Sequence, residues 1–294
     1  MTALIYLTLV LVWGSTWLMI TFQLGVVPPE TSVAYRFAIA TLFMFGWVVL
    51  RGLPLRFSLR DHLFIALQGA LIFSTNFFLF YLAAQYLATG LLAIVFSTSS
   101  AMTMLLSSLV HRRAPSVRAL TGAGLGTLGL VVIFWPELAG VSFSGGAVAG
   151  LLLSLGGTAS FSLGGLVSAR NQMAGLSVRG STAWAMAYGV LLLTIYVLLR
   201  ERAFTFDPSF AYVGSLLYLA IVGSVIAFAC YFALLGRIGA ERTAYATVLF
   251  PVVALVLSTL FEGYAWSLTA FFGVLLTLGG NLLVLHRPAA AGAG

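Results

Sequence analysis

A small set of polar and aromatic side chains inside long apolar segments has the chemistry to bind a small solute. Asn76 and Phe80 lie one helical turn apart, so an amide and a ring would face the same side of a helix. Amides and hydroxyls can hydrogen-bond a solute, and aromatic rings can form an apolar wall around it. The candidate solute-binding residues are Trp17, Asn76, Phe80, Ser97, Ser100, Trp184, Tyr231 and Tyr245.

For the hydroxyl groups in this set, a structural role is an equally good interpretation. Serine and threonine often close contacts between helices or hydrogen-bond to their own backbone. The hydroxyls of residues 89–107 recur near a helical period and form one stripe. Asn76 carries an amide that is harder to bury alone, which favours a place at the wall of a cavity. Trp17 lies near the middle of its segment, whereas interfacial tryptophans lie near the ends.

Arg36 and Pro251 are the candidates for gating and for bending a helix. Arg36 lies about five residues from one end of its apolar segment. Its long side chain could reach outward to the membrane surface, or it could bind a solute carboxylate or a gate partner. Pro251 lies inside an apolar segment, where it removes a backbone hydrogen bond and is expected to kink the helix.

The residues that catalysis or metal binding would need are missing from the apolar segments. No aspartate or glutamate lies in the middle of one, and His62, His111 and His286 all lie at segment ends. Cys230 is the single cysteine, which excludes a disulfide and a thiolate metal site. We therefore predict that the protein is not an enzyme and that it has no metal site and no cofactor. The missing carboxylates also disfavour an intramembrane proton relay.

The composition requires a lipid environment. Of 294 residues, 61% are hydrophobic and 7% are charged, and the mean hydropathy is +1.10. An ordinary soluble domain is about 45–50% apolar and about 25% charged. A soluble enzyme and a nucleic-acid-binding protein are therefore excluded, and the net charge of +7 does not indicate DNA binding.

Clusters of arginine, proline and acidic residues divide the chain into ten apolar segments. A helix needs about 20 residues to cross a hydrocarbon core about 30 Å thick. We therefore predict an all-α polytopic membrane protein with ten transmembrane helices. The segments are residues 3–24, 31–50, 62–84, 88–110, 118–135, 145–169, 180–199, 211–235, 241–261 and 266–286.

The arginines are distributed unequally between the two sides of this topology. With the N-terminus in the cytoplasm, the outer connections carry Arg200 and Arg202 only. Basic residues are enriched in cytoplasmic connections, so both termini are predicted to be cytoplasmic. The inner connections and the C-terminal tail carry Arg51, Arg56, Arg60, Arg112, Arg113, Arg118, Arg170, Arg179, Arg237, Arg242 and Arg287.

A weak internal repeat relates the two halves of the chain. Residues 81–134 can be laid over residues 231–285 at an offset of about 150 residues, with Gly122 and Gly129 opposite Gly273 and Gly280. A unit of five helices is odd in number, so its second copy enters the membrane in the opposite orientation. We expect one five-helix repeat in residues 1–140 and a second, inverted one in residues 141–294.

Several short motifs follow one another in an order typical of a known family. They are Trp13-Gly14-Ser15-Thr16-Trp17, Arg36-Phe37, Phe250-Pro251, Glu262 and the glycines from Gly273 to Gly280. With these motifs and its ten-segment frame, the chain resembles the EamA-type drug/metabolite transporters over essentially its whole length. Within them it is most similar to the YddG-type exporters of aromatic and other amino acids. The chain has Ser99-Ser100-Ala101 and His111-Arg112 where the family often has proline and glutamate, so exact functional symmetry between the repeats is not expected.

The resemblance implies a secondary transporter of the bacterial inner membrane. It would export aromatic and other zwitterionic amino acids, or similar small metabolites, by alternating access and as a monomer. Its partners would be a small-molecule solute and the lipid bilayer, with no nucleic acid. Two alternatives stay open, which are a facilitative channel-like pore, indicated by the hydroxyl stripe, and an exporter of another metabolite or drug class.

Overall fold

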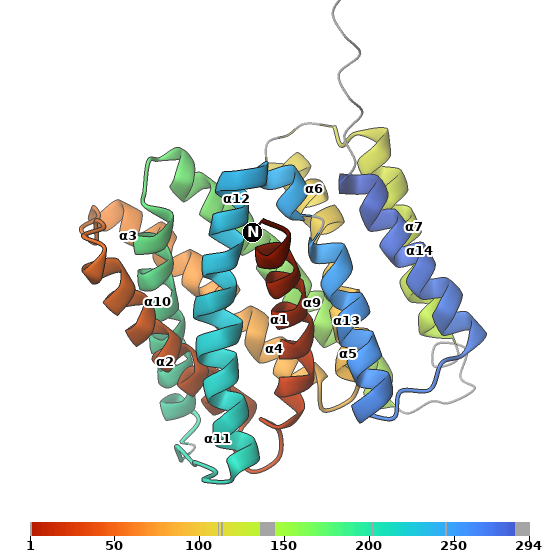
Figure 1. Ribbon diagram of the computed structural model, residues 1–294, viewed down its shortest axis with the longest axis horizontal. Helices are drawn as coiled ribbons and strands as arrows, with labels where there is room; N and C mark the ends of the chain where they lie inside the picture. Colours follow the sequence, from red (N-terminus) through yellow and green to blue (C-terminus); the bar gives the residue numbers. More distant parts are fainter. Residues whose placement is uncertain are drawn as a thin grey trace, which may run out of the picture.

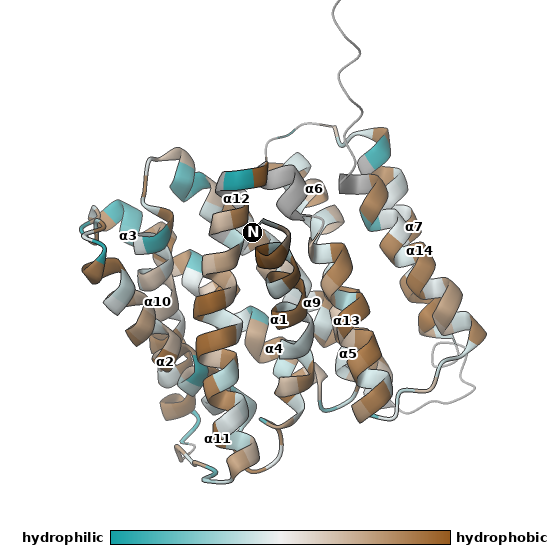
Figure 2. Ribbon diagram, in the orientation of Figure 1, coloured by the Kyte–Doolittle hydropathy of each residue, from teal (hydrophilic) through white to brown (hydrophobic). Residues whose placement is uncertain are grey.

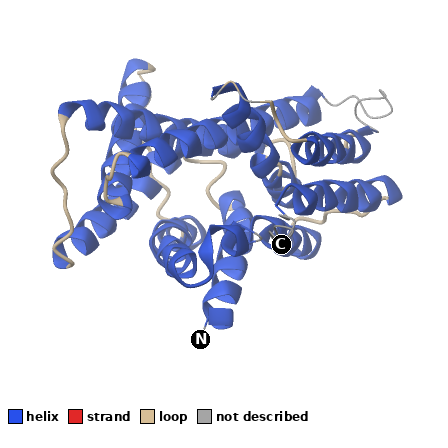
Figure 3. Ribbon diagram, turned by 90° about the horizontal axis from the view of Figure 1, so that it is seen from above, coloured by secondary structure: helices blue, strands red, loops and turns tan. Residues whose placement is uncertain are grey.

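The computed structural model describes residues 2–110, 112, 114–135, 145–201, 203–244 and 246–285, and every regular element within them is a helix (Figure 3). Two of these elements, η1 and η2, are π-helical. The helices are α1 (Thr2–Thr21), α2 (Pro29–Leu50), α3 (Leu59–Gln68), η1 (Gly69–Asn76), α4 (Phe77–Ala83), α5 (Thr89–Ser97), α6 (Ser99–Val110), α7 (Val117–Ile133), α9 (Gly145–Met173), α10 (Val178–Leu199), α11 (Phe210–Leu217), η2 (Tyr218–Ile226), α12 (Ala227–Ala244), α13 (Ala246–Phe261) and α14 (Leu268–Leu285).

Most predicted apolar segments coincide with one helix or with a run of consecutive helices. The exception is the connection predicted at residues 236–240, because α12 continues through it to Ala244. Among the described residues, seven helical stretches are long and apolar enough to cross a membrane. Three further apolar helices are shorter, covering residues Leu120–Ile133, Ala246–Phe261 and Leu268–Leu283. The prediction of an all-helical membrane protein is thus confirmed, while ten crossings stays a prediction.

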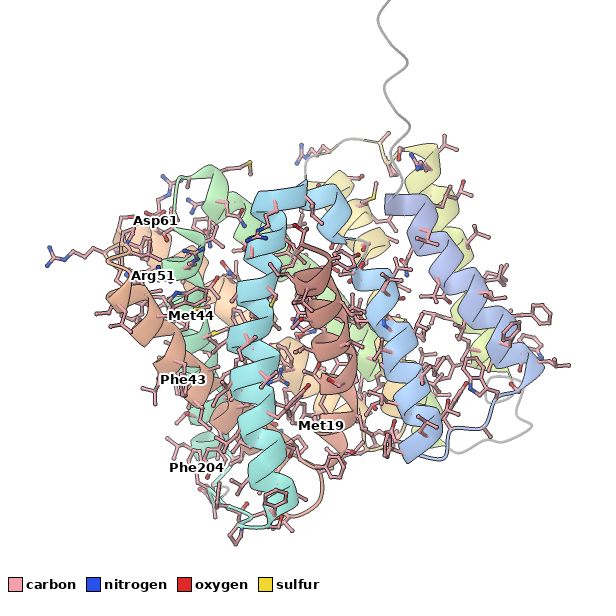
Figure 4. The ribbon with its side chains drawn as sticks, viewed as in Figure 1. Met19, Phe43, Met44, Arg51, Asp61 and Phe204 are labelled. Atoms are coloured by element: carbon pink, nitrogen blue, oxygen red, sulfur yellow. The ribbon has the colours of Figure 1, made fainter. Side chains whose placement is uncertain are left out.

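Hydrophobic residues predominate along the middle of the helices, whereas several hydrophilic ones lie near helix ends (Figure 2). Neighbouring residues of α2 show the division between surface and core. Phe43 is 50% exposed at the edge of the bundle, whereas Met44 is completely buried and points inward (Figure 4). A surface with so many exposed large hydrophobic side chains fits lipid rather than water.

Local sequence sets where several helices begin. Pro29 lies in the first turn of α2, where its missing amide proton costs nothing. Serines cap α3, α10 and α11, since the hydroxyls of Ser58, Ser177 and Ser209 each accept a hydrogen bond from the amide three residues later. These short caps explain why the predicted segment starts agree with the structure to within a few residues.

Helices of the two chain halves pack on each other in matching pairs. α2 packs on α10, α5 on α13 and α7 on α14. The first helix of each half packs on the third of the other, because α1 contacts η2 and α12 while α9 contacts η1 and α4. In Figure 1, α1 lies centrally between α12 and α13, and α7 and α14 lie side by side at the right edge.

Glycines allow the α7 and α14 backbones to touch. A Cβ added at Gly129 would lie 2.6 Å from the Gly273 carbonyl oxygen, and one added at Gly280 would collide with the Gly122 carbonyl oxygen. In the sequence repeat Gly122 corresponds to Gly273, and Gly129 to Gly280. The contact of Gly129 with Gly273 is therefore repeated, with the two halves exchanged, by the contact of Gly280 with Gly122. Contacts across a two-fold axis are reciprocal in this way.

The two π-helical stretches occupy corresponding positions in the two halves. η1 begins at Gly69 and η2 at Tyr218, which is the offset of about 150 residues seen in the sequence repeat. Each interrupts the third helical stretch of its half. In η2, the Ser224 hydroxyl donates to the Leu219 carbonyl oxygen at 3.0 Å, five residues earlier. π-Helical turns are frequent at functional sites, so this pair directs attention to the helices beside it.

Candidate functional site

A cluster of aromatic rings fills the space where helices of both halves meet. We call it the aromatic cluster, and Trp17 lies at its centre. The ring centroid of Trp17 lies 5.1 Å from that of Phe80 and 5.7 Å from that of Phe96. The contact with Phe80 is edge-to-face, an arrangement that is favourable for aromatic pairs at this distance. The cluster consists of Trp13 and Trp17 of α1, Phe80 of α4, Phe96 of α5, Phe161 of α9, Phe228 and Tyr231 of α12, and Phe250 of α13.

The motif at residues 13–17 builds one side of this cluster. Trp13 contacts Phe228, Tyr231 and Phe250, with centroid distances of 6.1, 5.7 and 6.2 Å. Gly14 lets α1 approach α13, because a Cβ there would lie 2.6 Å from the Val253 Cγ1 atom. The pattern of tryptophans around a glycine therefore has a physical reason. The glycine brings the helices together, and the rings fill the space on either side.

The structure brings three of the candidate residues into this cluster. Trp17 contacts Phe80 directly, and Tyr231 is connected to Trp17 through Trp13 and Phe250. Pro251 directly follows Phe250 and lies buried inside α13. Sequence reasoning missed Phe96 and Phe161, whose centroids lie 4.8 Å apart. Nothing local distinguishes these two rings among the 23 phenylalanines of the chain.

Asn76 and Ser97 are engaged in contacts between helices. The Asn76 Nδ2 atom donates to the Gly157 carbonyl oxygen at 2.8 Å, which ties η1 to α9. The Ser97 hydroxyl donates to the Ile94 carbonyl oxygen at 2.7 Å and accepts from the Asn281 side chain at 2.8 Å. Both side chains are buried. The Asn76 Nδ2 atom and the Ser97 hydroxyl thus have protein partners in this conformation.

Ser100 and Trp184 lie apart from the centre of the cluster. The Ser100 hydroxyl is 3.4 Å from that of Thr247, a long contact between α6 and α13. Trp184 donates its indole proton to the Leu55 carbonyl oxygen at 3.0 Å and packs on His62 with a centroid distance of 5.1 Å. The structure therefore does not bring Trp184 to Trp17. Tyr245 lies outside the described residues.

Arg36 is buried, contrary to the interpretation that its side chain reaches outward. Arg36 is 3% exposed. Its guanidinium carbon lies 4.6 Å from the ring centroid of Phe77 and 5.3 Å from that of Phe37. Packing a cation on ring faces compensates part of the cost of removing it from water. Arg36 is therefore part of the bundle interior.

The continuous helical stretch formed by α5 and α6 is well buried in its first part and much less buried in its second. In α5 most side chains are buried, whereas Ser99 and Ala101 are the buried residues of α6. The α5 end is also held by a side chain from the other half. The Glu262 carboxylate accepts hydrogen bonds from the Thr89 backbone amide at 3.1 Å and from the Thr89 hydroxyl at 2.8 Å. In the predicted topology, the tightly packed α5 half faces the periplasm and the α6 half faces the cytoplasm.

A second polar contact joins the halves at the opposite end of the bundle. The Arg170 Nη1 atom lies 3.4 Å from the Asp61 Oδ1 atom, and the guanidinium stacks on Phe64 at 3.7 Å from its centroid. Both side chains are partly exposed, so the pair is worth little to stability by itself. In the predicted topology it lies on the cytoplasmic side, between α3 and α9.

Two cavities lie away from the aromatic cluster. One, of about 610 Å³, lies between the α1–α2 connection, α4 and α10, and is lined by Gly25, Val26, Val27, Pro28, Pro29, Glu30, Phe78, Leu82, Gln85 and Tyr196. A smaller one of about 260 Å³ is lined by Leu53, Ser177, Val178 and Arg179. Within the described residues, no group of three or more His, Cys, Asp or Glu could hold a metal ion.

The bundle of long apolar helices is that of a polytopic membrane protein. The profile of the EamA-like transporter family matches residues 1–135 and 148–286. The chain belongs to this family, as the motifs predicted. It is therefore a transporter and not an enzyme.

Curated relatives match nearly the whole chain. A "Probable amino-acid metabolite efflux pump" of Salmonella typhimurium is 26% identical over 93% of this chain and 91% of its own length. The "Uncharacterized inner membrane transporter YedA" of Escherichia coli is 29% identical over 92% of this chain and 89% of its own. The "Uncharacterized transporter YvbV" of Bacillus subtilis is 26% identical over 96% and 91%.

The fold is shared with a solved structure. A chain titled "Crystal structure of protein" superposes with a TM-score of 0.66, covering 96% of this chain and 95% of that one at 20% sequence identity. This similarity shows that the arrangement of helices occurs in another protein. It carries no information about the solute.

Proposed function

We propose that this protein is a secondary transporter of the bacterial inner membrane that exports aromatic and other zwitterionic amino acids or similar small metabolites. The aromatic cluster carries this proposal, because α1, α4 and α5 contribute rings from one half and α9, α12 and α13 from the other. A site between two halves is where alternating access requires the solute to bind. Its rings suit a solute with an apolar or aromatic side chain.

Alternating access follows from an inverted repeat. We propose the two five-helix repeats at residues 1–140 and 141–294, with ten crossings and both termini in the cytoplasm. The matched helix pairs, the reciprocal glycine contacts of α7 and α14, and the equivalent positions of η1 and η2 support this division. The two segments matched by the family profile agree with it.

The conformation is consistent with a state that is closed toward the periplasm. Glu262 caps α5 at that end, and Phe96, which contacts the rings of Trp17 and Phe80, lies further along α5. The looser packing of α6 supports access from the cytoplasm. An exporter would load its solute from this side.

The described hydroxyl contacts do not favour a channel-like pore. The hydroxyls of Ser97 and Thr98 each donate to the carbonyl oxygen three residues earlier, both at 2.7 Å. These groups satisfy the backbone where α5 ends and α6 begins, instead of lining a continuous conduit. The similarity to the YddG-type exporters and the name of the Salmonella relative support an amino acid as the solute. Another metabolite or drug class is the alternative.

Transport by the purified protein in liposomes tests this function. L-Phenylalanine is expected to show saturable flux and counterflow, which an open pore would not give. Trp17→Leu should reduce this flux at least about tenfold, because it removes the central ring. Trp184→Leu is the matched control, since Trp184 lies outside the aromatic cluster. Equal flux in both variants, with equal amounts of folded protein, would overturn the assignment of the site.

A further inference from the structure

Two buried polar groups next to each other have no hydrogen-bond partner. The Arg36 Nε atom is buried without one, and no ion pair joins Arg36 to a described carboxylate. Tyr81 is completely buried, and its hydroxyl also has no hydrogen-bond partner. The two side chains lie close enough to interact electrostatically. A buried cation and a buried hydroxyl that both need an acceptor are unusual, because each unmatched group costs free energy.

The surroundings of Arg36 hold the cation but do not neutralise it. Phe37 and Phe77 cover the guanidinium with their rings. Tyr212 interacts electrostatically with Tyr81. The Tyr212 hydroxyl is hydrogen-bonded to the Ser32 hydroxyl at 3.0 Å. The contacts of the pair named here are therefore with ring faces and with a hydroxyl group that is already engaged. The missing component is a hydrogen-bond acceptor with negative charge.

The same residues connect to the aromatic cluster through ring contacts. Phe37 lies 5.3 Å from Phe73, Phe73 lies 6.3 Å from Phe228, and Phe228 lies 6.1 Å from Trp13 between ring centroids. The cation thus lies at one end of a continuous series of aromatic side chains. A solute with a carboxylate at one end and an apolar or aromatic group at the other matches both features.

We propose that Arg36 and Tyr81 form a carboxylate-binding subsite of this transporter. This deepens the proposed function, on which it rests for the carboxylate being that of the transported solute. The guanidinium donates to the carboxylate oxygens, and the Tyr81 hydroxyl donates to the same group. Binding supplies the acceptor that both groups lack, and it neutralises the buried charge while the solute passes.

Thermal unfolding of the purified, detergent-solubilised protein tests the subsite without requiring transport. The probe is 3-phenylpropanoate, and its matched control is 3-phenylpropanamide, which has the same ring and chain but no charge. We expect the carboxylate to raise the melting temperature of the wild type by several degrees and the amide to raise it much less. Equal effects of the two compounds would overturn the proposal. So would an equal shift with sodium phosphate or chloride, which would indicate a non-selective anion effect.

Variants assign this binding to the two residues. Arg36→Gln and Tyr81→Phe should each weaken the apparent affinity for 3-phenylpropanoate, the former by at least about tenfold. Arg36→Lys should retain part of the binding, because it keeps the charge but loses the planar fork. Arg200→Gln is the control, since Arg200 also stacks on a ring, that of Tyr196 at 5.5 Å, but is exposed. An unchanged affinity in Arg36→Gln would overturn the proposal.

A purely structural role for Arg36 predicts a different result. If the cation only held α2 in place, Arg36→Gln would melt well below the wild type without any ligand. We expect its unliganded melting temperature to be unchanged or higher, because the variant removes an uncompensated buried charge. If the wild type binds 3-phenylpropanoate but does not transport L-phenylalanine, the subsite stands and the proposed solute fails.

Discussion

Thr89 and Glu262 lie 173 positions apart in the chain and meet at the same end of the bundle. The carboxylate of Glu262, one residue after α13, accepts from both the amide and the hydroxyl of Thr89, the first residue of α5. It satisfies an amide that the helix itself leaves without a partner and places a negative charge at the positive end of the helix dipole. The contact also fixes two helices of different halves to each other.

Glu262→Ala is therefore expected to lower stability and to loosen this end of the bundle. Losing a helix cap costs about 1 kcal/mol, or a melting temperature lower by roughly 2–4 °C. Glu262→Gln keeps an acceptor and should lose about half as much. Thermal unfolding in detergent measures both, with Glu201→Gln as an exposed control. A Glu262→Ala protein as stable as the wild type would show that the cap contributes nothing.

The glycine contacts between α7 and α14 predict opposite effects for two similar substitutions. Gly129→Ala places a methyl group against the Gly273 carbonyl oxygen, which we expect to cost about 1–3 kcal/mol. Gly124→Ala in the same helix meets nothing within 4 Å and should stabilise by up to about 1 kcal/mol, because alanine favours the helix. Thermal unfolding of the two variants compares them directly. Equal destabilisation would mean that α7 and α14 do not pack in this way.

For Asn76, the structure changes the expected outcome of a substitution. Its amide ties η1 to the Gly157 carbonyl oxygen, so Asn76→Ala should cost about 0.5–1.5 kcal/mol of stability. Transport per folded molecule is then expected to stay within about twofold of the wild type. Melting temperature and flux, each normalised to folded protein, separate the two effects. Reduced flux with unchanged stability would support the prediction that Asn76 lines the solute site.

The helices could be predicted because their signals are local. Proline, arginine and acidic residues mark the ends of apolar segments, and the serines that cap α3, α10 and α11 lie at those ends. The π-helical stretches left no comparable signal. Both η1 and η2 lie inside continuous helical stretches, so the hydropathy of the chain does not distinguish them.

The candidate site could be predicted only in part because its contacts are distant in sequence. Trp17 was found because it lies in a short motif near the middle of a segment. The partner of Asn76 is a backbone carbonyl 81 positions away, which no local pattern reveals. Trp184 has the same residue type as Trp17, and only the packing of α10 on η1 and α3 separates it from the aromatic cluster. The residue types thus indicated which side chains could bind a solute. Which of them lie together depends on how the helices pack on one another.

Topology is tested by labelling single cysteines in a Cys230→Ser background. Ser116 and Trp266 both lie in connections and are exposed, but the predicted topology places them on opposite sides. In intact cells, a membrane-impermeant maleimide should label Trp266→Cys, and Ser116→Cys should react only after permeabilisation. Labelling of both from outside would overturn the ten-crossing arrangement and the inverted repeat with it.

Transport is expected to continue without a proton gradient. Among the described residues, the acidic side chains with a defined environment lie near helix ends, as with Glu30 in the first turn of α2, Asp61 in the first turn of α3 and Glu262 after α13. None lies in the middle of the membrane, where a proton relay would need a carboxylate. A solute gradient alone should therefore drive L-phenylalanine flux in liposomes with the pH difference and the membrane potential held at zero. The flux should then scale with the solute gradient and reverse when it is reversed. If flux ceases under these conditions and returns when a pH difference is imposed, proton coupling operates, and Glu30→Gln and Glu262→Gln would then identify the group that carries it.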